Sequence, residues 1–539
     1  MPQSDTPPEA RAQANDRLSS WKEIATFLNV SVRTAQRWER TERLPAHRHH
    51  HHDGASVYAY RSELEQWWND RPRPPSESGH SRAPSHSLSV AVLPFVNLSG
   101  QSSDEVVTDG LTEELITALA QVERLRVAAR TSSFHFKGRT DDVRTVARQL
   151  GVRTVLEGSV RRQGKRIRVT AQLINADDGC HLWARRFDCK FEDVFALQDQ
   201  ITSETVAALE GRLGSAGGDG QGRALARDVE AYELYLKGRY HWNKRLPHEV
   251  QIAAACFEAA IARSPKMARA HAALADCHAM TAPFQGNSVS EQMWKASSEA
   301  ERALQLDPNL GEAHAILGFV RACHDYDWPA AEAHFRRALD LNRDDARAHL
   351  WYAGTVLSAT GRLREADFHQ QRAAELDPMS PVVIAGFGAD WVFQHQYDSA
   401  ISACLRALEL DPSYPWALRW LGKAYLLKGM YKEAVSALEK IETPVHGCGL
   451  LGWSYLRAGC RDKADHMLRD LEDQASPALA LQLATLKLAF GQEDAALECL
   501  GQARISRNVG IHWLKVDPIW DPLRPRAGFQ ALLGQMHLE

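Results

Sequence analysis

The 539-residue sequence predicts a multidomain protein with three folded parts: a small N-terminal block of helices and a hairpin, an α/β middle domain with a mixed sheet, and a C-terminal all-α repeat solenoid. Three observations predict this division. Residues 71–87 are rich in Pro and Ser and residues 214–224 in Gly, so neither segment can build a core. Between them, strand-like alternation mixes with helical stripes. From residue 225 to 539, helical patterns repeat with a fixed period.

Composition narrows the class of protein. The formal net charge is only −4, so a contact with nucleic acid would have to depend on a local patch. The nine cysteines are scattered without a CxxC pair, which indicates reduced thiols. Residues 1–16 are polar and indicate a disordered segment without the apolar core of a signal peptide. No apolar run reaches the ~18 residues that a membrane helix needs. We therefore expect a cytoplasmic protein with no membrane contact.

The N-terminal block, residues 17–70, begins with a helix signal. Ser20 followed by Glu23 is a capping-box pattern. An apolar stripe follows, formed by Ile24, Phe27 and Leu28. After a tight turn, Ser31 can cap a second helix whose inward positions include Trp38. Two short helices joined by a turn, the second bearing several arginines, are typical of a helix-turn-helix. The predicted DNA-binding residues of the second helix are Arg33, Thr34, Gln36, Arg37 and Arg40.

A histidine run, "AHRHHHHDG" at 46–54, follows this helix. Its Asp-Gly pair predicts a hairpin turn that leads into the alternating strand "SVYAY". Because strand neighbours point to opposite faces, the run cannot converge on one metal ion. We interpret it as a hairpin wing, with Arg48, His49 and His50 near DNA phosphates. The alternative is a solvated hairpin tip with no binding role.

The block resembles the winged helix-turn-helix domains of the MerR/excisionase type. "WKEIATFLNVSVRTAQRWER", "LPAHR" and "YRSELEQWW" carry the resemblance. It implies that the second helix enters the major groove of double-stranded DNA while the wing meets the backbone. Residues 18–68 contain seven Lys or Arg and six Asp or Glu, so one copy should bind DNA weakly. This balance favours a homodimer or another multivalent arrangement.

The middle domain, residues 88–213, mixes both periodicities. The predicted elements are strands at 89–98 and 125–130, helices at 106–122, 143–151 and 192–213, and two or three antiparallel strands within 152–188. One strand alternates cleanly, with apolar Ile167, Val169, Ala171 and Leu173. This alternation predicts a sheet with one buried face.

The same region resembles the TolB N-terminal-like, or FlgO-like, α/β domain. "VAVLPFVNLSG", "GLTEELITAL" and "VFALQDQI" carry the resemblance. It implies a domain that bacteria often place between an effector, which is a winged helix or a class III cyclase, and tetratricopeptide repeats. It implies no catalytic residues.

No pattern in the middle domain indicates chemistry. There is neither a phosphate-binding GxxxxGK[ST] loop nor an HExxH zinc motif. Glu113 and Glu114 would repel a phosphate at their helix. A basic string, Arg161, Arg162, Lys165, Arg166 and Arg168, favours a solvated sheet face, with a nucleic-acid or nucleotide contact as the alternative. We expect no enzymatic activity, no catalytic residue, no metal and no cofactor.

The C-terminal region, residues 225–539, repeats every 34 residues. The repeated positions are Gly354, Gly388 and Gly422, then Ala366, Ala400 and Ala434, then Pro378 and Pro412. This period of paired helices is the signature of tetratricopeptide (TPR) repeats, which the sequence resembles over about 230–500. We count roughly seven helix pairs, followed by a terminal cap at 510–536.

Such solenoids have a concave groove lined by the first helix of each pair. The groove candidates are Trp351, Val382, Ala389, Phe393, Trp416, Arg419, Lys423, His446 and Trp453. Each of them also fits a packing role. As a set, aromatic side chains with Arg419 and Lys423 predict a protein or peptide ligand with acidic character.

The three domains together predict a bacterial DNA-binding transcriptional regulator with a protein-interaction module. The alternative is a TPR scaffold or adaptor that acts without specific DNA binding. A third hypothesis, an enzyme with a nucleotide site in the middle domain, has no motif in its favour.

Overall fold

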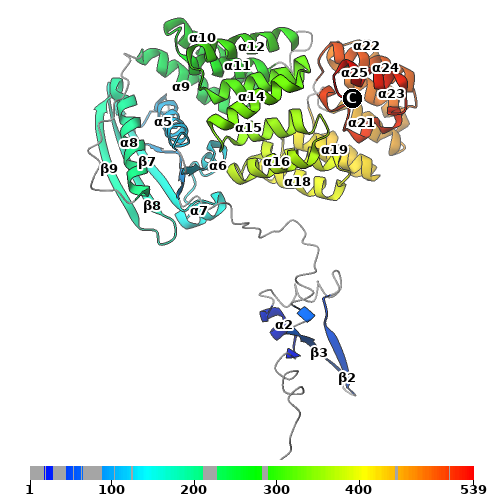
Figure 1. The fold of residues 1–539 in the computed structure, drawn as a ribbon, viewed down its shortest axis with the longest axis horizontal. Coiled ribbons are helices and arrows are strands. Elements are labelled where there is room, and N and C mark those ends of the chain that lie inside the picture. Colours follow the sequence, from blue (N-terminus) through cyan, green and yellow to red (C-terminus); the bar gives the residue numbers. More distant parts are fainter. Residues whose placement is uncertain are drawn as a thin grey trace, which may run out of the picture. The chain divides into compact units, whose positions relative to one another are not determined.

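A computed structural model describes residues 17–18, 20–27, 44–51, 54–61, 63–64, 88–101, 103–122, 125–210, 228–281, 289–442, 447–508 and 510–539. The chain divides into two compact units, residues 1–85 and residues 86–539 (Figure 1). The first unit contains the predicted N-terminal block. The second unit contains both the α/β domain and the repeats. The hinge predicted at 214–224 lies outside the described residues.

The N-terminal unit contains the predicted first helix and hairpin. Its elements are β1 (Arg17–Leu18), α2 (Trp21–Phe27), β2 (His47–His51) and β3 (Gly54–Tyr60), and the antiparallel sheet has the order β1-β3-β2. The capping box is confirmed in part, since Glu23 N donates to Ser20 Oγ over 3.2 Å. The buried apolar side chains are Leu18, Ile24, Leu44, Ala59 and Leu64.

The middle region is an α/β domain with a mixed sheet, as predicted. Its strands are β4 (Leu88–Val92), β5 (Val96–Asn97), β6 (Leu125–Val127), β7 (Thr154–Gln163), β8 (Arg166–Asn175) and β9 (His181–Lys190). Its helices are α5 (Ser103–Leu119), α6 (Arg130–Phe134), α7 (Val143–Leu150) and α8 (Val194–Leu209), with a 3-10 turn at Phe191–Asp193. The sheet order is β6-β4-β7-β8-β9, with β5 beside β7.

The sheet is parallel at one end and antiparallel at the other. β4 pairs parallel with β6 and β7, whereas β7, β8 and β9 form an antiparallel meander. The alternation predicted for β8 is confirmed, since Ile167, Val169, Ala171 and Leu173 are fully buried. The predicted strand at 125–130 ends at Val127, and the unpredicted helix α6 begins at Arg130. Tertiary contacts of α6, described below, account for this difference.

The C-terminal region is built from eight antiparallel helix pairs in the described part of the chain, one more than the sequence suggested. The pairs are α9 (Val229–Asn243) with α10 (Pro247–Arg263), α11 (Ala268–Thr281) with α12 (Val289–Leu306), α13 (Gly311–Val320) with α14 (Trp328–Leu341), α15 (Ala346–Trp351) with α16 (Leu363–Leu376), α17 (Pro381–Phe393) with α18 (Tyr397–Leu410), α19 (Pro415–Lys428) with α20 (Tyr431–Leu438), α21 (Cys448–Arg457) with α22 (Arg461–Gln474), and α23 (Ala480–Ala489) with α24 (Glu493–Ile505). Two π-helical segments, Arg321–Asp325 and Tyr352–Leu357, extend α13 and α15. A short 3-10 turn, Pro477–Leu479, precedes α23.

Small residues at the repeated positions allow the helices to approach closely. The three repeated alanines are fully buried. A side chain at Gly388 would collide with Cys404, and one at Gly422 would collide with Leu438. Gly354 is different, because it lies in a π-helical segment where a side chain would meet nothing within 4 Å. Close helix packing therefore accounts for two of the three glycines that recur every 34 residues.

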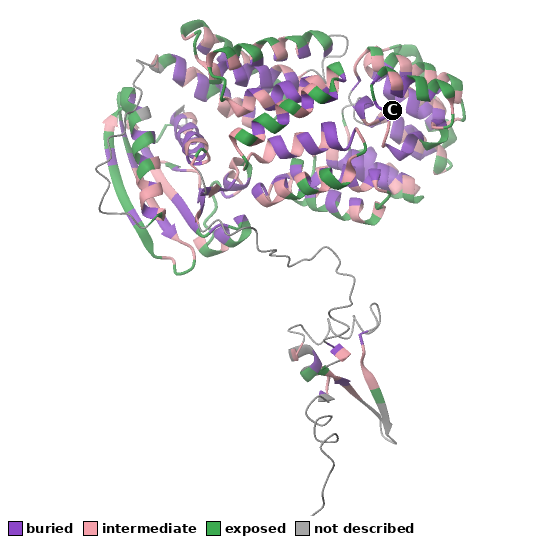
Figure 2. Cartoon of the chain, viewed as in Figure 1, coloured by how far each residue is buried: buried purple, intermediate pink, exposed green. Residues whose placement is uncertain are grey.

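The α/β domain and the first repeats share one hydrophobic core. This core continues from β4 and α5 through Tyr235 and Leu236 of α9 to Phe257 of α10. Helix α5 is buried along nearly its whole length (Figure 2). At Gly110, in the middle of α5, a side chain would collide with Leu236. The two predicted domains are therefore packed as one body at this contact.

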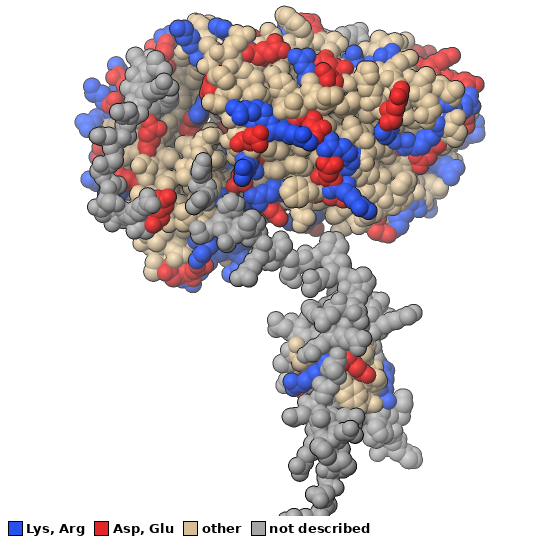
Figure 3. Space-filling model, viewed as in Figure 1, with Lys and Arg blue, Asp and Glu red and all other residues tan. Residues whose placement is uncertain are grey.

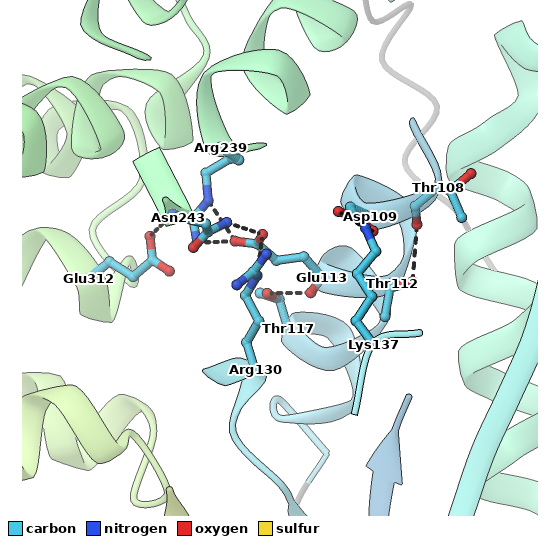
Figure 4. A network of polar contacts seen from close by, with 10 residues as sticks. All are labelled: Thr108, Asp109, Thr112, Glu113, Thr117, Arg130, Lys137, Arg239, Asn243 and Glu312. Carbon is cyan, nitrogen blue, oxygen red and sulfur yellow. Dashed lines mark hydrogen bonds and ion pairs between the residues drawn. The ribbon is translucent and has the colours of Figure 1, made fainter. Parts of the chain in front are cut away.

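A buried carboxylate also joins helix α5 to helix α9 (Figure 4). Glu113 of α5 accepts hydrogen bonds from Arg239 Nε at 2.7 Å, from Arg130 Nε at 2.9 Å and from Asn243 Nδ2 at 2.9 Å. Burial disfavours the charged form of Glu113, but the charges of Arg239 and Arg130 outweigh it and lower the pKa to about 2. Glu114 forms a second ion pair, 2.6 Å from Arg269 of α11.

A second contact ties the domain to the turn between α16 and α17. Ser132 of α6 donates through its N at 3.0 Å and through its Oγ at 2.6 Å to Asp377 Oδ1. Arg126 Nη2 donates to the carbonyl of Glu375 over 2.7 Å. Ala129 N, at the start of α6, donates to the carbonyl of Leu376. These bonds stabilise a five-residue helix that local sequence alone would not support.

We predict that Glu113→Gln destabilises residues 86–539 by about 3–5 kcal/mol, because it leaves Arg239 and Arg130 buried without a counter-charge. Chemical denaturation followed by circular dichroism measures the loss. The matched control is Glu105→Gln, which removes a carboxylate of the same helix that pairs with Lys137 and is 31% exposed. This control should cost less than about 1 kcal/mol.

The pairing of Glu113 with Arg239 and Arg130 also predicts that stability depends on pH. The pKa of Glu113 is lowered from 4.5 to about 2 in the folded protein, so its stabilisation is complete above pH 4.5 and is lost as the pH falls toward 2. The stability difference between wild type and Glu113→Gln should therefore shrink over this window. A difference that stays constant from pH 5 to pH 2 would contradict the assignment.

Candidate functional site

The hairpin of the N-terminal unit contains the predicted wing residues. The register places Arg48 opposite Val57, His49 opposite Ser56 and His50 opposite Ala55. Arg48 is exposed. The prediction of a hairpin within 46–60 is thus confirmed, and its contact with DNA stays a prediction.

His47 has a structural position that sequence reasoning did not assign. Its Nε2 lies 2.6 Å from Glu63 Oε2, and its ring stacks on Tyr58 with centroids 5.2 Å apart. The side chain therefore joins the hairpin to the segment that follows it. The candidates of the second helix, Arg33, Thr34, Gln36, Arg37 and Arg40, lie outside the described residues and stay predictions.

The predicted groove of the repeats contains the chain's own C-terminal segment. Residues 510–523, with 3-10 turns at Ile511–Trp513 and Pro518–Leu523, precede the final helix α25 (Ala527–Gln535). The Trp513 ring lies 5.4 Å from Trp420, 5.8 Å from Phe393 and 6.0 Å from Trp416, between centroids. Trp513 Nε1 donates to the carbonyl of Gly354 over 2.7 Å.

The two groove cations are also covered. Lys423 is buried and forms an ion pair with Asp517. Burial is the largest cause that lowers the pKa of Lys423, to about 8, although Asp517 favours its charged form. Arg419 is buried beside Gly510. The acidic ligand expected at these residues is therefore present within the chain, as Asp517.

The groove candidates Ala389, Phe393, Arg419 and Lys423 are all buried, as in the packing role that each of them also fits. The physical reason is that the segment after α24 returns to helices α17 and α19. Trp513 and Trp520 are unusual in a solvated tail, so the sequence indicated that this segment packs against the protein. It did not indicate which helices the segment would contact.

The remaining groove candidates lie in different surroundings. Trp351 lies elsewhere, with its ring 5.0 Å from Phe319 and beneath the guanidinium of Arg347. Val382 is 39% exposed, and Trp453 is partly buried against the core. His446 lies outside the described residues.

The described residues show neither a membrane span nor a metal cluster. Within those ranges, no helix is long and apolar enough to cross a bilayer. No group of three His, Cys, Asp or Glu side chains there could hold a metal ion. Positive and negative side chains are interspersed on the face of residues 86–539 seen in Figure 3.

Family models match the middle domain and the repeats. Residues 85–204 match the model described as "HilA/YgeH-like transcriptional regulator, second domain". Residues 235–281 and 327–381 match a tetratricopeptide repeat model, and residues 394–429 match a second TPR model. The middle domain is therefore a HilA/YgeH-like regulator domain, and the helical region contains TPR repeats. The resemblances to the TolB-like and MerR/excisionase families stay predictions.

Two relatives with different names illustrate the similarity to parts of the chain. "Putative adenylate cyclase 3" of Rhizobium meliloti is 39% identical over 234 residues, 43% of this chain and 40% of the relative. "Transcriptional regulator HilA" of Salmonella typhimurium is 26% identical over 164 residues, 30% of this chain and 29% of the relative. The chain therefore spans less than half the length of each of these relatives.

Solved structures resemble the chain only in part. YrrB, described as a TPR protein with an unusual peptide-binding site, is 22% identical and covers 40% of this chain and 97% of its own, with a TM-score of 0.26. A monomeric mutant of IFIT1 is 15% identical and covers 57% of this chain and 77% of its own, with a TM-score of 0.39.

We predict that Trp513→Ala destabilises the repeats by about 3–5 kcal/mol, because it empties the aromatic site between α17 and α19. Thermal denaturation measures the shift. The matched control is Trp294→Ala on α12, where the tryptophan is 69% exposed and the expected change is within about 0.5 kcal/mol. Equal, small shifts for both variants would show that the segment does not pack in the groove.

Proposed function

We propose that this chain is a DNA-binding transcriptional regulator whose N-terminal unit contacts double-stranded DNA. The observation that supports the proposal is the β2–β3 hairpin with its exposed Arg48, which follows the predicted arginine-bearing segment in the sequence. A hairpin beside a recognition helix is a recurrent way to add backbone contacts to a major-groove contact. The HilA/YgeH-like second domain supports the proposal, since its family is described as one of transcriptional regulators.

The charge of the N-terminal block determines how strongly, and at which salt concentration, it would bind DNA. The N-terminal block is nearly neutral, so the affinity of one copy for DNA should be weak and sensitive to salt. Two copies on one DNA molecule would add their contacts, which favours a homodimer on DNA.

The repeats supply the second half of the proposed function, which is binding of a protein partner. TPR repeats are typical protein-binding and peptide-binding modules. In this chain, residues 510–523 occupy the groove of α17 and α19. A protein partner therefore either displaces that segment or binds the repeats outside it.

We predict that the full chain binds a duplex from upstream of its own coding sequence more tightly than a random duplex. The variant Arg33→Ala/Arg37→Ala should lose at least tenfold in affinity and lower the salt slope by about 0.9 for each phosphate contact removed. Fluorescence anisotropy across a salt series measures both quantities.

The matched control changes two arginines of β8, Arg166→Ala/Arg168→Ala, which are exposed on the sheet of the α/β domain. This variant should bind DNA as the wild type does. Loss of binding in the control alone would move the DNA contact to the sheet. Equal affinity of the wild type for both duplexes, with the fold intact, would favour the scaffold or adaptor.

We further propose that the chain is not an enzyme. The relative named as an adenylate cyclase matches it over 40% of the relative's length, and the N-terminal unit of 85 residues is too short to contain all 234 aligned residues. The similarity therefore extends into residues 86–539, which contain the regulator domain and the repeats.

We predict that the full chain produces no cyclic AMP from ATP with Mg²⁺ or Mn²⁺ above a protein-free blank. A purified class III cyclase serves as the positive control. Formation of cyclic AMP that scales with the concentration of the chain would overturn the proposal.

A further inference from the structure

Three arginines of the repeats converge on one tryptophan. The guanidinium carbons of Arg239, Arg245 and Arg347 lie 5.3, 3.6 and 6.0 Å from the centroid of the Trp242 ring. Arg239 and Trp242 belong to α9, Arg245 follows that helix, and Arg347 belongs to α15. First helices of separate pairs thus bring positive charges together, as such helices do on the concave side of a solenoid.

Carboxylates neutralise two of these arginines. Arg239 pairs with Glu113 and lies 4.0 Å from Glu312. Arg347 Nη1 lies 2.5 Å from Asp276 Oδ2. The Arg245 side chain makes neither a hydrogen bond nor an ion pair within the described ranges, although the charge of Asp276 favours its charged form. Its N–H donors therefore keep their capacity to bind an anion.

Charges of both signs act on Arg245, which is exposed to solvent. Crowding of its guanidinium by neighbouring groups is the largest cause that lowers its pKa, to about 10. The charge of Asp276 opposes this effect, and repulsion by Arg347 and Arg239 adds to it.

The backbone at Arg245 has a φ of 59°, in the left-handed region that favours glycine. First helices of later pairs are followed by glycine in this region at Gly361, Gly429, Gly459 and Gly491, and by another residue at Tyr326 and His395. A glycine at position 245 would avoid the strain, so the fold should accept Arg245→Gly.

One buried donor beside the arginines has no hydrogen-bond partner among the described residues. It is Trp242 Nε1, on the ring that the arginines surround. Buried polar groups are nearly always hydrogen-bonded, so this N–H can donate to an oxyanion.

We propose that Arg245, Arg347 and Arg239 form a binding site for a small ligand that presents an oxyanion, either a phosphate or a carboxylate group. Guanidinium groups bind both oxyanions through paired, charge-assisted hydrogen bonds. The site does not depend on DNA binding by the N-terminal unit. Arg239 also holds Glu113, so a ligand there would lie next to the contact between the repeats and the α/β domain.

The test is calorimetric titration of the full chain with inorganic pyrophosphate and, separately, with citrate, at constant ionic strength. We expect saturable binding of at least one probe to the wild type. Arg245→Gly should weaken it at least tenfold, because it removes a charge-assisted contact. Glycine suits the left-handed backbone, so this variant should fold as the wild type does.

The matched control is His395→Gly, an exposed residue with the same φ of 59° after α17, which should bind as the wild type does. Binding of pyrophosphate alone identifies a phosphate ligand, and binding of citrate alone identifies a carboxylate ligand. Absence of saturable binding, equal affinity of Arg245→Gly and the wild type, or equal loss in His395→Gly would overturn the proposal.

Discussion

The buried carboxylate of Glu113 is the interaction on which the arrangement of residues 86–539 depends. A charge buried away from water is stable only when it is paired and fully hydrogen-bonded. Arg130 from its own domain and Arg239 with Asn243 from the first repeat meet that requirement together. The α/β domain cannot leave the repeats without exposing this charge and opening the shared apolar core. The first repeats and the α/β domain are therefore held together by a paired buried charge and a shared apolar core.

The C-terminal segment gives the repeats a second constraint. Trp513 and Asp517 meet an aromatic site and a buried lysine, which is the complementarity expected of an acidic peptide ligand. Because the segment belongs to the same chain, its effective concentration is far above that of a free peptide. The groove thus stabilises the solenoid, and recognition of a partner has to use other surfaces or compete with this segment.

Relatives named as a cyclase and as a transcriptional regulator each match less than half of their own length to this chain. A fold can serve several functions, since function depends on the sites attached to it. The proposed DNA contact lies in the N-terminal unit, whereas the proposed oxyanion site lies at the contact of the α/β domain with the repeats. This separation suits the regulator proposed above, because the two proposed sites belong to different units of the chain.

The sequence by itself determined the local elements. Alternation in β8, the Asp-Gly hairpin signal and the 34-residue period each arise from neighbours in the chain, and each was predictable for that reason. Tertiary structure alone decided the burial of Glu113, the helix α6 and the filling of the groove. Ser132 meets Asp377 across 245 residues of chain, and Trp513 meets Gly354 across 159. Periodicity shows which face of a helix or strand is apolar. It does not specify which distant segment will pack against that face, because the packing partner depends on how the whole solenoid curves.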